Sequence, residues 1–336
     1  MQFDVAVVGA TGLVGTKMLE ILSEKNFPVR NLCMYASKKS AGKEVEYKGK
    51  SYKVIELKKE NILDKDIDIA LFSAGGDTSL EFAKYFVEIG AVVIDNSSAW
   101  RMDKEVPLVV PEVNPDALKD HKGIIANPNC STIQAMPVLK ALSDRYGLER
   151  VVYSTYQAVA GAGIQGIEDL QNGLKGEKPK KFQYDIAGNL IPQIDTFLDN
   201  GYTKEEMKMV NETRKILSLP DLRVTATCVR VPVETSHSES VNVELKSDFD
   251  LKEVFELLSN TEGVVVEDDT ANLKYPMPLY VAGKDPVYVG RIRRDYSNKN
   301  TLNLWIVSDN IRKGAALNAV QIAEKLAEMG LLEGAE

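Results

Sequence analysis

Residues 3–26 of the chain read FDVAVVGATGLVGTKMLEILSEKN, and this stretch decides the fold of the first part of the protein. The apolar run at residues 3–8, which carries a single charge, is typical of a buried parallel strand. A glycine-rich turn follows at once, and the apolar residues behind it, such as Met18 and Leu22, recur at helical spacing. Strand, glycine turn and helix in this order are the context of a dinucleotide-binding fingerprint.

The glycines of this turn are Gly9, Gly12 and Gly15, a variant of the usual G-x-G-x-x-G spacing. A helix that begins here would offer unpaired backbone N–H groups and the positive end of its dipole to a pyrophosphate. Glycine turns of this kind also serve tight packing alone, so a purely structural role stays open. We interpret the motif as a cofactor site because of its strand and helix context.

The segment after the next predicted strand, residues 31–36, bears on the choice of cofactor. Proteins that prefer NAD usually carry Asp or Glu about 20 residues beyond the glycines, where it binds the ribose 2′-hydroxyl. Here the chain has Ser37, Lys38, Lys39 and Ser40. Hydroxyl and ammonium groups suit a 2′-phosphate, so the sequence favours NADP. A solvated turn with two surface lysines is the alternative.

Length and composition narrow the class of protein. The chain has 336 residues, enough for about two domains, and 44% of them are hydrophobic. A net charge of −8 gives no general attraction to nucleic acid or anionic membranes, and neither is expected as a partner. The N-terminus lacks the features of a signal peptide, and no apolar run approaches a membrane span. Three scattered cysteines argue against a disulfide framework and for a reducing, cytoplasmic location.

The order of predicted elements indicates an α/β protein with two different halves. Further strands within residues 66–76, 91–101 and 123–130, with a helix at 77–90, predict a doubly wound, mostly parallel sheet. Ligands bind beyond the carboxyl ends of such strands. From about residue 128 the pattern changes to strands interrupted by single helices, which predicts an α+β domain with a mixed sheet. Residues 171–201 show no clear period, which is typical of functional, interfacial or mobile segments.

The segment NPNCST at residues 127–132 contains a candidate nucleophile, Cys130. A free cysteine is most often a small core residue, which is how we interpret Cys33 and Cys228. If a helix begins at Cys130, its N–H groups and dipole favour the thiolate. A nucleophilic thiol also needs a base, and the chain has only two histidines. His121 lies between charged residues in a predicted turn, so elimination favours His237.

Several cations could bind an anionic substrate. Arg230 precedes His237 by seven residues, and Arg101 ends a predicted strand. Their guanidinium groups suit carboxylates and phosphates. Lys208 follows Glu205 by one helical turn, a pair that surface stabilisation of a helix would explain equally well.

A nucleotide fold, a thiol, one histidine and anion-binding arginines together suggest acyl transfer coupled to hydride transfer. The thiolate adds to an aldehyde, a hydride leaves to the nicotinamide, and phosphate cleaves the resulting thioester to an acyl phosphate. The reverse sequence reduces an acyl phosphate. A thiolate suits both directions because it is a good nucleophile at neutral pH and a good leaving group from acyl carbon.

Eight ordered motifs extend this reading to a family. They are GATGLVG, SAGG, DNSSAWR, PNCST, YQAVAGAG, EEMKMVNETRKIL, RVPVETSHSES and RKGAALNAVQIAEKL. Through them the chain resembles the aspartate-semialdehyde dehydrogenase family over nearly its whole length. The resemblance implies a Rossmann NADP-binding domain at residues 1–127, completed by a helix at 312–336, and a catalytic and dimerisation domain at 128–311. It also implies a homodimer.

The reaction implied by the resemblance is the reductive dephosphorylation of L-4-aspartyl phosphate to L-aspartate 4-semialdehyde with NADPH. This step leads towards lysine through diaminopimelate, and towards threonine, isoleucine and methionine. In this family Cys130 would be the nucleophile, His237 the acid/base, and Gln157 the residue that orients the acyl intermediate. Residues expected at the substrate are Arg230 for its carboxylate, Glu205 for its amino group, and Arg101, Asn129 and Lys208 for its phosphate.

The resemblance also implies a set of cofactor contacts and no metal. The residues expected to contact NADP are Gly9, Thr11, Gly12, Leu13, Val14, Ser37, Ser40, Ser73, Gly75, Asn96, Gly163 and Asn318.

Two kinds of rival remain. N-acetyl-glutamyl-phosphate reductase and glyceraldehyde-3-phosphate dehydrogenase also combine a nucleophilic thiol with a Rossmann domain. The segments at 205–217 and 230–240 favour aspartate-semialdehyde dehydrogenase over both. A redox-sensing protein that binds NADPH without turnover is the non-enzymatic alternative.

Overall fold

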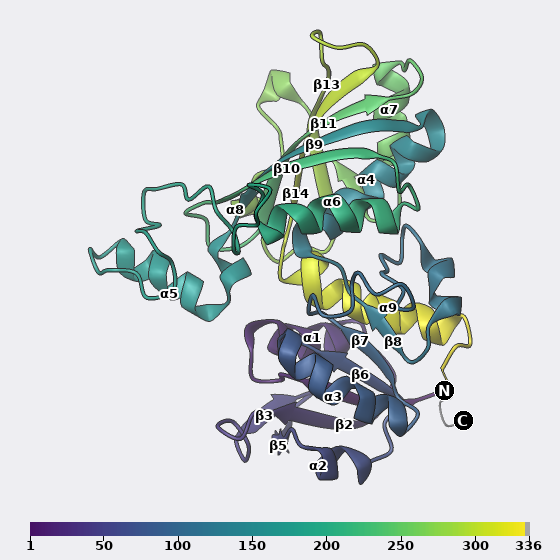
Figure 1. Ribbon diagram of the computed structural model, residues 1–336, viewed down its shortest axis with the longest axis vertical. Helices are drawn as coiled ribbons and strands as arrows, with labels where there is room; N and C mark the ends of the chain where they lie inside the picture. Colours follow the sequence, from purple (N-terminus) through teal and green to yellow (C-terminus); the bar gives the residue numbers. More distant parts are fainter. Residues whose placement is uncertain (333–336) are drawn as a thin grey trace. The chain divides into compact units, whose positions relative to one another are not determined.

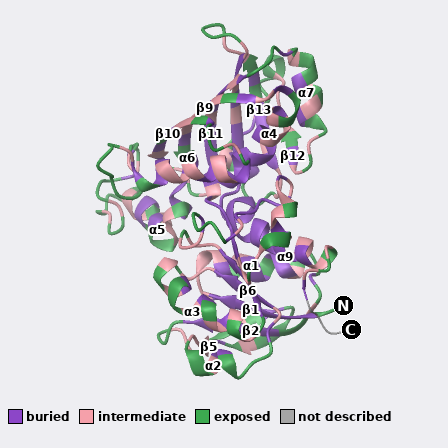
Figure 2. Cartoon of the chain, turned by 45° about the vertical axis from the view of Figure 1, so that its right-hand side comes forward, coloured by how far each residue is buried: buried purple, intermediate pink, exposed green. Residues whose placement is uncertain are grey.

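The computed structural model describes residues 1–332, which form two compact units (Figure 1). The first unit comprises residues 1–128 and the chain from Ala315 onwards, and the second comprises Asn129–Gly314. Within the described residues, each unit contains one six-stranded sheet. Figure 2 shows that buried residues concentrate on these sheets and on the helix faces that cover them.

The sheet of the first unit is parallel throughout, in the order β5-β2-β1-β6-β7-β8. Its strands are β1 (Phe3–Val8), β2 (Val29–Ala36), β5 (Ile55–Glu56), β6 (Ile69–Phe72), β7 (Val92–Asp95) and β8 (Ile124–Ala126). A small antiparallel hairpin is formed by β3 (Glu44–Tyr47) and β4 (Lys50–Lys53). The order and direction of the strands confirm the predicted doubly wound α/β class.

Helices cover both faces of this sheet, as a doubly wound fold requires. The helices are α1 (Leu13–Glu24), α2 (Lys59–Leu63), α3 (Gly76–Glu88) and α9 (Leu317–Glu328). One apolar cluster joins α1 and α9 to one face through residues such as Met18, Leu22 and Val320. A second cluster places Ile62 of α2 and Phe86 of α3 on the other.

The glycine turn is as tight as the sequence predicts. Gly9 has a φ of +84°, and a Cβ there would lie 2.2 Å from the carbonyl oxygen of Ser73. A Cβ on Gly15 would lie 2.1 Å from the carbonyl oxygen of Gly9. The two glycines therefore let α1 start directly against the end of β1. Gly12 is the N-cap of α1 and carries no side chain that could occupy the first N–H groups of the helix.

The sheet of the second unit is mixed, in the order β10-β9-β11-β14-β13-β12. Its strands are β9 (Leu148–Gln157), β10 (Arg223–Arg230), β11 (His237–Leu245), β12 (Val264–Val266), β13 (Val287–Arg294) and β14 (Thr301–Ser308). The outer pairs β10·β9 and β12·β13 are parallel, and the inner pairs are antiparallel. This confirms the predicted α+β unit with a mixed sheet.

Two long helices of the second unit position the candidate site. Helix α4 (Cys130–Tyr146) packs against β9, β11 and β14, and α6 (Lys204–Ile216) packs against β10 and α4. The other helices are α5 (Ile164–Gly173), α7 (Leu251–Ser259) and α8 (Pro278–Val281). Of residues 171–201, which the sequence left without a period, the first three end α5, and residues 174–203 contain no helix or strand.

Three local expectations differ from the structure. The run at residues 150–161 is strand-like throughout in the sequence, but β9 ends at Gln157 and a 3-10 turn, Val159–Ala162, follows it. The closing helix, expected from Arg312, begins with a π-helical turn, Arg312–Ala316, before α9. Cys33 is only half-buried, whereas Cys228 is fully buried.

Glu239, in the middle of the second sheet, is an unusual core residue. It is fully buried on β11, two residues beyond His237, and neither side-chain oxygen makes a hydrogen bond of normal geometry within the described residues. Burial raises the pKa of Glu239 well above its ordinary range, and the neighbouring Gln134 amide opposes this only in part. Burial therefore favours the neutral carboxyl in the folded protein.

The crowding at Gly15 generates a stability prediction. Gly15→Ala forces a methyl group against the Gly9 carbonyl, so we expect a loss of about 1–3 kcal/mol in the free energy of unfolding, measured by urea denaturation. Gly76→Ala is the control, because Gly76 is the first residue of helix α3 and its Cβ would meet the Ala99 side chain at an ordinary contact distance of 3.9 Å. It should keep or raise the stability. Equal stability of the two variants would contradict the packing argument.

The buried acid generates a second prediction, on pH. The folded state raises the pKa of Glu239, so its stabilising contribution is complete below the unfolded pKa, about 4.3, and is lost as pH rises towards the folded pKa. Glu239→Gln removes this loss. We expect the variant to unfold at higher urea than the wild type at pH 8, with the difference shrinking towards pH 4. The exposed control Glu262→Gln should show no such trend. A variant that is less stable at pH 8 would refute the assignment.

Candidate active site

The N-terminus of α4 holds the candidate nucleophile. Cys130 is the first residue of the helix and is half-buried, whereas Cys228 lies wholly in the core. Asn129 is the N-cap, and its amide oxygen accepts the backbone N–H groups of Ser131 and Thr132 at 3.0 and 3.4 Å. The N–H of Asn129 itself donates to the carboxylate of Glu212 at 2.7 Å. The thiol is thus fixed at the end of a helix whose dipole favours an anion.

His237 lies beside this thiol. Its Nε2 is 3.2 Å from Cys130 Sγ, and its Nδ1 accepts the backbone N–H of Ala158 at 3.0 Å. Because Nδ1 is an acceptor, a neutral ring carries its proton on Nε2, facing the sulfur. Burial, aided by the positive charge of Arg230, lowers the pKa of His237 well below its usual value. The imidazole is therefore neutral near pH 7, with a donor aimed at the thiol. His121, by contrast, lies half-buried after a 3-10 turn of the first unit.

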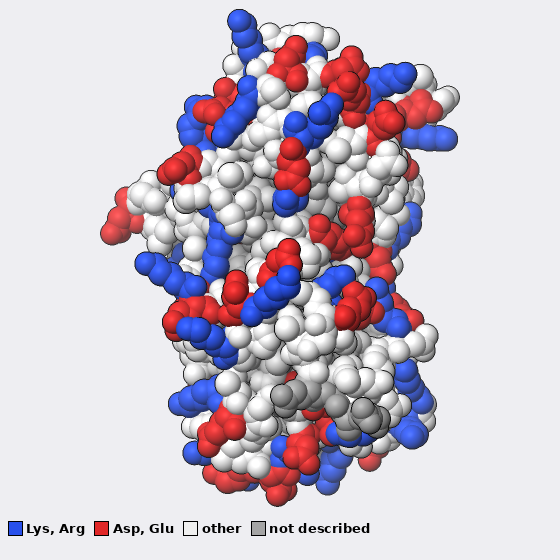
Figure 3. All heavy atoms as spheres, turned by 90° about the vertical axis from the view of Figure 1, so that its right-hand side faces the viewer, with Lys and Arg blue, Asp and Glu red and all other residues white. Residues whose placement is uncertain are grey.

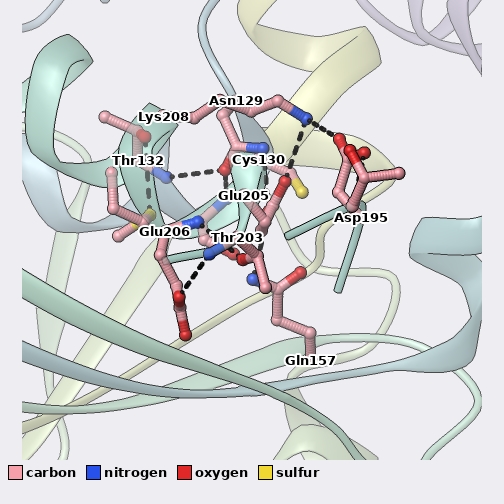
Figure 4. Close-up of polar contacts among 12 residues, drawn as sticks. Asn129, Cys130, Thr132, Gln157, Asp195, Thr203, Glu205, Glu206 and Lys208 are labelled. Carbon is pink, nitrogen blue, oxygen red and sulfur yellow. Dashed lines mark hydrogen bonds and ion pairs between the residues drawn. The ribbon is translucent and has the colours of Figure 1, made fainter. Parts of the chain in front are cut away.

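A buried carboxylate, Glu205, joins three of the predicted site residues (Figure 4). It accepts hydrogen bonds from Asn129 Nδ2 at 2.9 Å and Gln157 Nε2 at 3.1 Å, and pairs with Lys208 Nζ at 3.1 Å. Burial acts to raise the pKa of Glu205, but Lys208 and the two amides outweigh it, so the pKa is lowered. Since Glu205 is buried, its pair with Lys208 is no ordinary surface pair. A capping box at the start of α6, made by Thr203 and Glu206, fixes this turn of the helix.

Arg230 lies at the end of β10, on the same side of the second unit as His237. Its Nη1 donates to the carbonyl of Ala158 at 2.8 Å, and its guanidinium lies over the ring of Phe182, 5.9 Å from the centroid. A Cβ on Gly161 would lie 2.8 Å from that Nη1 and 3.2 Å from the His237 ring. The absence of a side chain at Gly161 therefore keeps space beside both groups. Burial lowers the pKa of Arg230, and Glu205 opposes the shift.

Sequence reasoning missed several residues that shape this site. Ala158 acts through its backbone, Gly161 through the lack of a side chain, and Glu212 through its contact with the N-cap residue. A Cβ on Gly314 would lie 2.9 Å from Cys130 Cβ, so this glycine too is required by close approach. The clustered alanines and glycines of residues 158–163 were the one visible signal.

Five of the residues assigned to the cofactor in the first unit line a common cavity of about 460 Å³. Those that line it are Gly9, Thr11, Gly12, Ser37 and Ser73, together with Lys38. Beside them the cavity holds Glu56 and Phe82, which sequence reasoning missed. The open N–H groups of α1 at the same turn fit a pyrophosphate. The cavity therefore suits the phosphorylated part of a dinucleotide.

Other predicted cofactor residues do not line this cavity. Leu13 and Val14 are the first residues of α1, and Gly75, with a φ of +87°, is the N-cap of α3. The N–H of Ser40 donates to the carbonyl of Ser37, which closes a tight turn after β2. Gly163 belongs to the second unit, where it starts α5 with a φ of +80°.

A chain of side-chain amides brings Asn96 and Asn318 together in the first unit. Asn127 donates to Asn96 Oδ1 at 2.7 Å and accepts from Asn318 Nδ2 at 2.7 Å. Arg101 donates to the carbonyl of Asn127 and to that of Asn96, both at 2.9 Å. Asn127, which sequence reasoning missed, thus connects three predicted site residues at the carboxyl ends of β7 and β8.

The described residues contain no helix that is both long and apolar enough to cross a membrane. In the same part of the chain, no three or more His, Cys, Asp and Glu side chains gather in a way that could hold a metal ion. On the face drawn in Figure 3, basic and acidic side chains are interspersed and neither sign forms a broad patch.

Comparisons with known families identify both halves of the chain. Residues 4–121 match the model of the semialdehyde dehydrogenase NAD binding domain, and residues 139–313 match that of the semialdehyde dehydrogenase dimerisation domain. The aspartate-semialdehyde dehydrogenase of Aquifex aeolicus is 56% identical, covering 99% of this chain and 100% of the relative. That of Bacillus subtilis is 49% identical, covering 98% of each.

Solved structures agree with this assignment. The crystal structure of aspartate semialdehyde dehydrogenase II from Vibrio cholerae superposes with a TM-score of 0.93 at 48% identity, covering 98% of this chain and 99% of that one. A second structure of the Vibrio cholerae enzyme, complexed with ASA, also gives 0.93, at 47% identity and with the same coverage. An enzyme with NADP from Candida albicans gives 0.76 at 26% identity, covering 98% of this chain and all of that one. Like the motifs of its sequence, these likenesses show that the chain belongs to the aspartate-semialdehyde dehydrogenase family.

Proposed function

We propose that the chain catalyses the reductive dephosphorylation of L-4-aspartyl phosphate to L-aspartate 4-semialdehyde with NADPH, through a thioester on Cys130. The observation that carries the proposal is the pair formed by Cys130 Sγ and His237 Nε2, 3.2 Å apart at a helix N-terminus. The activity is that named for the relatives from Aquifex aeolicus and Bacillus subtilis. The Vibrio cholerae relative solved with ASA supports the same substrate class.

The chain's own residues carry the covalent steps. The thiolate of Cys130 attacks the acyl carbon of the substrate, a C–S bond forms, the C–O bond to phosphate breaks, and inorganic phosphate leaves. NADPH, when bound, supplies the hydride that reduces the thioester carbon. The Nε2–H of the neutral His237 ring donates a hydrogen bond to the oxyanion that develops there and stabilises it. The oxyanion then re-forms the carbonyl of the aldehyde as the C–S bond breaks, and the thiolate of Cys130 is released.

The surrounding groups match the charges of the substrate. Arg230, buried beside the open space at Gly161, would bind the α-carboxylate, and the ionised Glu205 would face the amino group. Gln157, held by Glu205, would orient the acyl group. Phosphate is assigned to the cations Arg101 and Lys208 and to the amide of Asn129.

The wider assignments follow the same proposal. Residues 1–127 with the helix at 312–336 would form the NADP-binding domain, and residues 128–311 the catalytic and dimerisation domain of a cytoplasmic homodimer. The match of residues 139–313 to a dimerisation domain supports the dimer. The product would feed the synthesis of lysine, threonine, isoleucine and methionine. Ser37 and Lys38, which line the cofactor cavity, support NADP over NAD.

The covalent step is tested by mass. Wild-type protein incubated with aspartyl phosphate, without NADPH, should gain one aspartyl group on Cys130. Cys130→Ser should fold and bind NADPH but lose on the order of 10³-fold or more in turnover. Cys33→Ser, a change in the first unit, is the matched control and should remain active. Near-normal turnover of Cys130→Ser would return this residue to a structural role.

The same assay separates the rival functions. Oxidation is followed with NADP⁺ and phosphate for aspartate semialdehyde, N-acetylglutamate semialdehyde and glyceraldehyde 3-phosphate. The proposal requires the highest kcat/KM for the first aldehyde. A chain that binds NADPH but shows no phosphate-dependent turnover would be the redox sensor.

Cofactor choice is tested by the ratio of kcat/KM for NADPH and NADH. We expect NADPH to be preferred, and Lys38→Ala to lower the ratio about tenfold, because one charge-assisted contact to a 2′-phosphate is lost. The exposed lysine of the β3–β4 turn provides the control variant, Lys48→Ala, which should leave the ratio unchanged. A wild-type preference for NADH would refute the assignment.

A further inference from the structure

The ammonium of Lys208 is held between two carboxylates. It lies 3.1 Å from Glu205 Oε2 and 3.0 Å from Asp195 Oδ2, and Figure 4 shows it pointing between the two side chains. The proposed function, on which this inference rests, gives the same ammonium a phosphate group to bind. Phosphate and two carboxylates all compete for one positive charge. Binding of phosphate is therefore easiest if one carboxylate gives up its contact.

Glu205 is unsuited to give up this contact. Its side chain is only 6% exposed, and it also accepts hydrogen bonds from Asn129 and Gln157. Removing the lysine would leave a buried carboxylate with its countercharge lost, which is strongly unfavourable. The Glu205–Lys208 contact is thus the permanent one.

Asp195 has the opposite character. Its side chain is 33% exposed, and it belongs to the stretch 174–203 that forms no helix or strand within the described residues. Its φ of +67° is a left-handed conformation, which Asp and Asn tolerate better than most residues. The other carboxylate oxygen accepts the neighbouring N–H of Thr196, at 2.8 Å, a contact that is local to the turn.

Asp195 is nevertheless charged at neutral pH. Burial acts to raise its pKa, but the N–H of Thr196 and the ammonium of Lys208 outweigh it and lower the pKa. Solvent can stabilise this carboxylate if the lysine turns away from it. The Asp195–Lys208 ion pair is therefore formed in the unliganded protein, and breaking it costs little free energy.

We propose that Asp195 is the displaceable counter-ion of Lys208, and that the phosphate of the substrate takes its place. Asp195 holds the ammonium in line with the site while the phosphate position is empty. The same contact weakens phosphate binding, because the carboxylate competes for the lysine and repels the anion. Asp195 is thus a positioning residue that sets phosphate affinity and phosphate release.

The test is Asp195→Asn, which keeps the acceptor for Thr196 and the left-handed backbone but removes the charge. Inorganic phosphate should bind about fivefold tighter by calorimetry, the size expected for one partly exposed ion pair. In the oxidative assay the KM for phosphate should fall by a similar factor. The kcat and the KM values for aldehyde and NADP⁺ should stay within about twofold of wild type.

Three further variants make the result specific. Asp195→Glu restores the charge and should return phosphate affinity towards that of wild type. Asp199→Asn removes an exposed charge four residues away and should change nothing. In a Lys208→Gln background, Asp195→Asn should no longer strengthen phosphate binding, since the two effects act through one contact.

Unchanged or weaker phosphate binding by Asp195→Asn would overturn the inference and make Asp195 a plain support for Lys208. Failure of the proposed function looks different, because the wild type would then show no phosphate-dependent oxidation of aspartate semialdehyde. Calorimetry with inorganic phosphate needs no turnover, so it decides the role of Asp195 in either case.

Discussion

The geometry of the candidate site depends on one buried charge, the carboxylate of Glu205. A carboxylate in a protein interior strongly destabilises the folded state unless opposite charge and hydrogen bonds compensate it. The compensation comes from the turn before α4, from the end of β9 and from the next turn of α6. Each donor is thereby fixed in direction. Because they stabilise one ion, the amides of Asn129 and Gln157 and the ammonium of Lys208 all point to Glu205.

The backbone of a single residue, Ala158, has a comparable role in the other half of the site. The N–H of Ala158 binds the His237 ring and its carbonyl binds Arg230. The two side chains therefore cannot shift independently of the strand end between them. Their closeness also matters electrically, because the fixed guanidinium charge helps to keep the imidazole neutral. The backbone of Ala158 and the lack of a Cβ at Gly161 therefore define the space around these two side chains.

The sequence allowed prediction of features that depend on neighbouring residues. The strand–turn–helix at the start, the two sheet types and the helix that begins at Cys130 all follow from local pattern and capping. Strand β12 was not predicted because Val264–Val266 is too brief to show a period. Helical spacing alone could not separate a buried Glu205 from a surface one. The roles of Glu212 and Asp195 were also not predicted, since each acts through a contact that only the folded chain creates.

Both the oxygen and the nitrogen of the Asn129 amide make hydrogen bonds, and this has a consequence for the chemical stability of the protein. Its oxygen caps α4, and its nitrogen donates to Glu205 at 2.9 Å, so the orientation of the group is unambiguous. Deamidation would preserve the cap but set a second carboxylate directly against Glu205, where two negative charges repel strongly. Deamidation of this one side chain would therefore disturb the start of the helix that bears Cys130, with no other chemical change in the chain.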